Sequence, residues 1–74
     1  MSNNEIKSFI SLSGINQYEV ANKLGITEFY LCRLFRQELS EKWKEKIVSA
    51  IKEILTQRRN EINEILDRIE NNNN

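Results

Sequence analysis

The sequence has no histidine, no proline, one cysteine and only two glycines among its 74 residues. Without histidine, no serine or cysteine nucleophile can be activated by an imidazole, and no histidine metal site can form. No glycine-rich phosphate-binding loop is present either. We therefore expect a protein that is not an enzyme and that uses no metal and no cofactor.

The lone cysteine, Cys32, cannot form an intrachain disulfide, which is typical of proteins in a reducing compartment. The first five residues are polar and acidic, unlike the basic start of a signal peptide. No apolar run approaches the roughly 20 residues that cross a bilayer. We expect a cytoplasmic protein that makes no contact with a membrane.

The scarcity of proline and glycine, together with abundant Ile, Leu, Glu, Lys and Asn, predicts an all-α fold. A domain of this size buries only about 60% of its unfolded surface, so its stability margin is small. Good helix packing or a partner subunit is then needed.

The net charge is zero, but the charges are unevenly distributed. Residues 1–60 hold ten Lys and Arg against seven Asp and Glu, whereas residues 61–74 hold one against four. The chain is therefore a mildly basic body followed by an acidic tail, unless this is chance scatter over a solvated surface.

A first amphipathic segment predicts a helix over about residues 4–12. Asn3 or Asn4 can cap its start, and Gly14 follows its end in the position of a left-handed cap. Its apolar set is Ile6, Phe9, Ile10 and Leu12.

The two segments that follow are each about two turns long. Asn16 and Glu19 have the spacing of a capping box, which begins a helix over about residues 17–24. After a turn, Thr27 can cap a third helix over about residues 28–36.

The turn between these two helices carries one glycine, as in the unit that many proteins use to read DNA. Gly25 tolerates the positive φ that the turn needs, the small Ala21 lets the helices cross closely, and Ile26 plugs the turn into the core. The residues expected to point inward are Val20, Ala21, Leu24, Leu31, Leu34 and, as a further candidate, Phe35.

A fourth segment, capped by Ser40, runs without a helix breaker from residue 41 to about residue 70. Positions 48, 51, 55, 58, 62, 65 and 69 have the spacing of a heptad seam, which Arg58 interrupts. Residues 56–61 are wholly polar and form either a bare turn of one long helix or a bend between two shorter ones. Residues 71–74 are all asparagine, and we expect them to be disordered.

One stretch of the chain resembles the helix-turn-helix of the Cro/repressor (XRE-like) family of phage and bacterial regulators. The matching pattern is Gln17-x-x-Val20-Ala21-x-x-Leu24-Gly25-Ile26-Thr27, followed by Leu31-Cys32-Arg33-Leu34. The start of the third helix at Glu28-Phe29 and the segment 36–39 resemble very small regulators of phages and other mobile elements. The resemblance implies a compact four- to five-helix, lambda-repressor-like or Cro-like DNA-binding domain over residues 1–55, with a C-terminal helical extension over residues 56–70.

The resemblance further implies that the helix over residues 28–36 enters the major groove of double-stranded DNA. The candidates for reading bases are Glu28, Phe29 and Arg33, with Cys32 and Arg36 as secondary contacts. The candidates for phosphate contacts are Asn16, Gln17, Thr27, Lys42, Lys44 and Lys46.

Each of these residues also has a simpler interpretation. Glu28 is equally a favourable first-turn acid, Phe29 a core or partner-facing residue, and Cys32 a small filler rather than a redox sensor. The three lysines are equally ordinary solvated charges.

Family members usually act as dimers, and the C-terminal extension supplies a candidate interface. It would bury against a second copy, or else fold back on the helix over residues 4–12. At its seam position, Arg58 could fix the register or pair with Glu61 of the second copy. The candidate dimerisation residues are Leu55, Arg58, Ile62, Ile65, Leu66 and Ile69.

These observations predict a homodimeric, sequence-specific DNA-binding protein, a transcriptional repressor of a phage or mobile element acting at the bacterial nucleoid. Two alternatives stay open. The scaffold could serve as a protein-binding module, such as an inhibitor or antirepressor, because the net charge is zero and the third helix begins with an acid and an aromatic residue. It could also be a DNA-binding accessory factor for recombination.

Overall fold

The computed structural model describes residues 1–72, which form four α-helices and no β-strand. The helices are α1 (Asn3–Ser13), α2 (Gln17–Leu24), α3 (Glu28–Phe35) and α4 (Glu41–Asn72). The all-α prediction is therefore confirmed, and both ends of α1, α2 and α3 lie within one residue of the positions expected. None of the helices in this part of the chain is both long enough and apolar enough to cross a membrane.

The expected N-cap of α1 was wrong. Ser2, rather than Asn3 or Asn4, caps the helix, with its hydroxyl accepting from the backbone N–H of Glu5 at 3.2 Å. The side chain of Asn3 is used elsewhere, because it holds the connection between α3 and α4. Its amide donates to the carbonyl of Gln37 at 2.5 Å, and its oxygen accepts from the N–H of Leu39 at 3.2 Å.

The two glycines end the first two helices. Gly14 and Gly25 have φ values of 73° and 74°, in the left-handed region that residues with a Cβ rarely adopt. The capping box at the start of α2 forms, with the N–H of Asn16 donating to Glu19 Oε2 at 2.8 Å. Local sequence signals therefore fix the lengths of α1 and α2.

One unbroken helix, α4, occupies the C-terminal half of the chain, so the polar stretch 56–61 is a turn of that helix and not a bend. Ser40 caps its start, accepting from the N–H of Trp43 at 3.3 Å. The expectation of disorder from residue 71 was wrong at Asn71 and Asn72, which continue the helix; the other two asparagines of that prediction lie outside the described residues.

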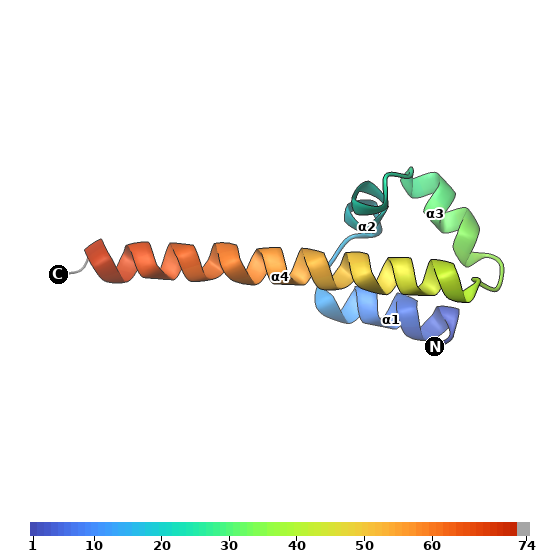
Figure 1. Ribbon diagram of the computed structural model, residues 1–74, viewed down its shortest axis with the longest axis horizontal. Helices are drawn as coiled ribbons and strands as arrows, with labels where there is room; N and C mark the ends of the chain where they lie inside the picture. Colours follow the sequence, from blue (N-terminus) through green and yellow to red (C-terminus); the bar gives the residue numbers. More distant parts are fainter. Residues whose placement is uncertain (73–74) are drawn as a thin grey trace.

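The first turns of α4 form the centre of the fold (Figure 1). On one side of α4 lies α1, and on the other side lie α2 and α3. The sequence places the isoleucines of α4 at helical spacing, and the buried Ile47 and Ile51 fill the space between these layers. The buried apolar residues are Ile6, Ile10, Ile15, Val20, Ala21, Leu31, Phe35, Leu39, Ile47, Ala50 and Ile51.

Two apolar residues differ in their relation to the core. Leu12, from the apolar set of the first segment, is 89% exposed, because two residues beyond the buried Ile10 a helical side chain points to the opposite side. Leu39, in the connection between α3 and α4, is buried against the core.

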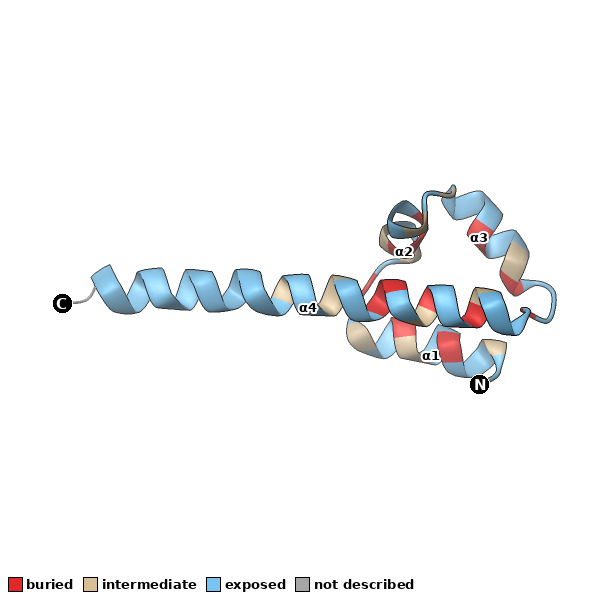
Figure 2. Ribbon diagram, in the orientation of Figure 1, coloured by how far each residue is buried: buried red, intermediate tan, exposed pale blue. Residues whose placement is uncertain are grey.

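Burial stops abruptly along α4 (Figure 2). Arg58 is the last half-buried residue, and every described residue from 59 to 72 is exposed. The C-terminal half of α4 thus runs free of the body, and the possibility that it folds back on α1 is ruled out. We call residues 59–72 the free arm of α4.

Candidate nucleic-acid interface

The position of α3 is set by its inner face. Leu31 is fully buried and Phe35 is buried, as the sequence predicted, while Leu34 is half-buried beside them. An eight-residue helix anchored through this face has to present its other face to solvent.

The turn between α2 and α3 is closed by hydrogen bonds. After Gly25, the N–H of Ile26 donates to the carbonyl of Ala21 at 3.0 Å, and Ala21 is almost completely buried between the helices. The hydroxyl of Thr27 accepts from the N–H of Tyr30 at 3.1 Å and so caps α3 as predicted. The two short helices are therefore held at a fixed angle to each other.

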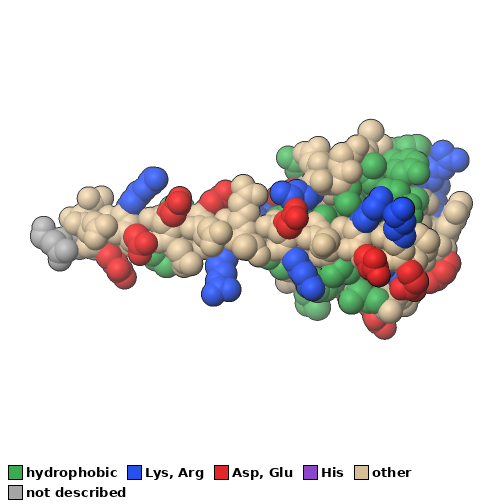
Figure 3. Space-filling model, viewed as in Figure 1, with side chains coloured by type: hydrophobic (Ala, Val, Ile, Leu, Met, Phe, Trp, Pro, Cys, Tyr) green, Lys and Arg blue, Asp and Glu red, His purple; other side chains and the backbone are tan. Residues whose placement is uncertain are grey.

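The outer face of α3 carries every residue that the sequence proposed for base contacts. All five are exposed, and Phe29 is 75% exposed despite being aromatic. We define the α3 outer face as Glu28, Phe29, Cys32, Arg33 and Arg36. Figure 3 shows hydrophobic surface over the end of the molecule where α3 lies, with basic side chains beside it.

The N-terminus of α2 borders this face. The thiol of Cys32 donates to Gln17 Oε1 at 3.3 Å, which ties the first residue of α2 to the middle of α3. Asn16 precedes it and has an exposed side chain. The amides at the start of a helix favour an anion, and at the start of α2 the Glu19 carboxylate already accepts from the N–H of Asn16.

The three lysines at the start of α4 differ from one another. Lys42 and Lys46 are exposed, the latter with its ammonium 5.1 Å from the centre of the Trp43 ring. Lys44 was wrongly expected to contact phosphate: only 8% of it is exposed, and its Nζ is 3.0 Å from Glu38 Oε1 and 3.5 Å from Glu41 Oε1.

The ion pairs of Lys44 explain why it is unavailable. The hydrogen bond to Glu38 raises the pKa of Lys44, against a smaller lowering by burial, so the ammonium is held charged between two carboxylates. Lys44 stabilises the connection between α3 and α4 instead of offering a charge to a ligand.

Sequence reasoning missed an aromatic pair at the edge of the interface. Tyr30, which is partly exposed on α3, lies with its ring centre 6.3 Å from that of Trp43 on α4, the two rings inclined at 56°. A shallow hollow beside them is lined by Tyr30, Arg33, Leu34 and Gln37. The sequence signal for Tyr30 was its position on α3, directly after Phe29 and three residues before Arg33, both of which are candidates for base contacts.

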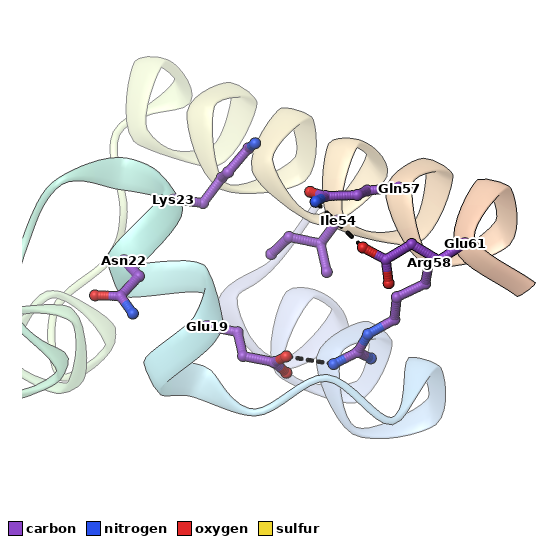
Figure 4. Close-up of a pocket in the computed structure, with 7 residues that line it drawn as sticks. All are labelled: Glu19, Asn22, Lys23, Ile54, Gln57, Arg58 and Glu61. Carbon is purple, nitrogen blue, oxygen red and sulfur yellow. Dashed lines mark hydrogen bonds and ion pairs between the residues drawn. The ribbon is translucent and has the colours of Figure 1, made fainter.

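Arg58, expected to lie in a dimer seam, is used within the chain (Figure 4). Its guanidinium forms an ion pair and hydrogen bond with Glu19 of α2. The backbone N–H of Asn16 and then Arg58 lower the pKa of the Glu19 carboxyl, since both favour the charged form. The seam interpretation is therefore wrong at Arg58, and Glu61 accepts from Gln57 at 3.4 Å in the same helix.

Leu55 also departs from the dimerisation prediction, because it is half-buried and packs against the core. The remaining four candidates form an apolar stripe on the free arm. Each of Ile62, Ile65, Leu66 and Ile69 is 51% to 56% exposed. The part of the chain described contains nothing that covers this stripe.

No protein-family model, no curated protein and no solved structure matches this chain.

Proposed function

We propose that this protein binds double-stranded DNA sequence-specifically, with α2 and α3 acting as a helix-turn-helix. In this proposal the chain is a homodimeric transcriptional repressor of the kind carried by phages and mobile elements. The observation that carries the proposal is the α3 outer face, whose five residues are all solvent-exposed while the opposite face of the helix is anchored by Leu31 and Phe35.

The dimensions and chemistry of α3 support insertion into the major groove. An α-helix with its side chains is about 10–12 Å across, which matches the roughly 12 Å width of that groove. Arg33 would donate two hydrogen bonds to guanine, Glu28 would accept from a cytosine amino group, and Phe29 would pack on a thymine methyl.

Contacts to the DNA backbone would come from the elements beside α3. Asn16 and Gln17 lie at the start of α2, where their side-chain amides would donate to phosphate, and Lys42 and Lys46 add exposed positive charge from α4. Such contacts orient the protein without reading sequence.

A salt titration of binding to selected DNA fragments tests the proposal. The logarithm of the binding constant is expected to fall linearly with the logarithm of salt concentration, with a slope of about −0.9 for each phosphate neutralised. Arg33→Ala should weaken binding by about 1–3 kcal/mol and relax the preference at one base position.

Lys52→Ala is the matched control. It removes one exposed positive charge from α4, away from the α3 outer face, and should leave base preference unchanged. Equal effects of the two substitutions on base preference would contradict the assignment of Arg33.

Phe29 favours a second candidate function, that of a protein-binding module. A phenylalanine that is 75% exposed beside an acidic residue is more typical of a protein-binding surface than of a phosphate-facing one. Absence of salt-dependent DNA binding, together with a partner lost on Phe29→Ser, would favour this function. A role as recombination accessory uses the same α3 outer face and predicts DNA bending without repression.

A further inference from the structure

The apolar stripe on the free arm is a feature that the fold of the chain leaves uncovered. Four branched side chains, Ile62, Ile65, Leu66 and Ile69, occupy one side of the last three turns, and each is more than half exposed. Their spacing of three, one and three residues places them on one face of the helix. An apolar helix face of this kind normally packs against another surface.

The charges beside the stripe indicate what kind of molecule could pack on it. Glu64, Asp67 and Glu70 lie along the C-terminal part of α4 with Arg68 among them, and the last turn contains no basic residue, an arrangement that the helix macrodipole disfavours. The basic residue Arg59 lies at the other end of the stripe, whereas the neighbouring Arg58 is paired with Glu19 in the same chain. The arm is thus electrostatically complementary to a reversed copy of itself.

We infer that the free arm pairs with the free arm of a second copy of this chain as a short antiparallel coiled coil. This inference rests on the proposed homodimer and specifies its geometry. In the register that places Ile62 opposite Ile65 of the second copy, the flanking Glu61 faces Arg68 of the second copy, and the twofold axis repeats the pair.

The antiparallel direction follows from comparing the two possible arrangements. A parallel pair in register would place Glu61 beside Leu66 of the second copy and bring the two acidic ends together. The antiparallel pair gives two ion pairs and places the acidic end of each arm near Arg59 of the other. Like charges are separated only in the antiparallel arrangement.

Charge reversal on these flanking positions tests the pairing. Glu61→Arg and Arg68→Glu should each raise the dimer dissociation constant about 3- to 10-fold, measured by sedimentation without DNA. The double variant E61R/R68E should restore it, because the two reversed partners attract again. A double variant no better than the single ones would overturn the antiparallel register.

A distance measurement provides a second test, independent of side-chain charge. A spin label at Lys52→Cys, in a Cys32→Ser background, should lie about 35 Å along the helix axis from its counterpart in the antiparallel dimer. In a parallel dimer the two labels would be about 20 Å apart or less, since the helices would run side by side. The shorter distance, or a monomer at all concentrations, would overturn the inference.

These outcomes are separable from those of the proposed function. The pairing is measured without DNA, and the Arg33→Ala comparison is made on the α3 outer face, which the free arm does not touch. A monomer that still reads DNA would refute the pairing alone, and a dimer that ignores DNA would refute the proposed function alone.

Discussion

The two halves of α4 differ in burial although they share one helix and one apolar periodicity. Ile51 and Ile65 are the same residue type, two heptads apart, yet Ile51 is fully buried and Ile65 is 54% exposed. The difference comes from α1, α2 and α3, which pack only around residues up to Arg58. An apolar seam therefore predicts a contact without specifying whether the contact lies within the chain or with a second molecule.

The strongest test of this difference is to make the same substitution in both halves of α4 and compare the losses of stability. Ile51→Ala should lower the free energy of unfolding by about 2–5 kcal/mol, because it leaves a cavity in the core. Ile65→Ala, measured by chemical denaturation at a concentration where the chain is monomeric, should cost less than about 1 kcal/mol. Similar losses at both positions would show that the arm is buried in the monomer.

Removing the free arm tests whether it serves dimerisation and not folding. A chain ending after Arg59 should keep the helical body, because every buried residue lies before that point, and should sediment as a monomer at all concentrations. Circular dichroism and sedimentation check both expectations. A dimer that survives the deletion would place the principal interface on the body.

A smaller effect is expected from the side chain that joins α1 to the α3–α4 connection. Asn3→Ala removes hydrogen bonds to Gln37 and Leu39 and should destabilise the fold by about 1–2 kcal/mol. Asn4→Ala is the control, since Asn4 is exposed and should cost less than about 0.5 kcal/mol. Equal costs in thermal unfolding would mean that the Asn3 contacts contribute nothing.

The smallest effect is expected from the ion pair between Glu19 and Arg58, which lies at the border between the two halves of α4. The pKa of Glu19 is lowered in the folded protein, so its contribution is present above the unfolded value near 4.5 and is lost as pH falls through the lower folded value. The unfolding free energy of the wild type should therefore drop more steeply below pH 4.5 than that of Glu19→Gln. Parallel pH profiles of the two proteins would exclude this linkage.

Local signals in the sequence were sufficient to predict most helix boundaries. The side chains of Glu19, Thr27 and Ser40 accept from backbone groups three residues away, and Gly14 and Gly25 stop helices by their own conformation. These interactions need no knowledge of the rest of the fold. The sequence therefore predicted α1, α2 and α3 to within one residue, but left open whether residues 56–61 bend the fourth helix and whether Phe29 lies in the core.

The errors occurred where distant parts of the chain meet. Asn3 looked like a cap, but its partners lie more than thirty residues away. Arg58 looked like a seam residue, but Glu19 of α2 pairs with it, and Lys44 looked like a surface charge, but the turn into α4 brings Glu38, six residues away, against it. Each depends on tertiary placement, which residue type and spacing alone do not encode.

Because α4 is one continuous helix, its length fixes the distance between the body and the free arm. It carries Trp43, beside α3, near one end and the apolar stripe near the other, with no joint between them. In the proposed dimer the two reading helices would lie about 60 Å apart along the arms, nearer two turns of DNA than one. Lengthening the arm by seven residues before Ile62 should move them about 20 Å further apart in nearly the same orientation, whereas adding four should also rotate them out of phase.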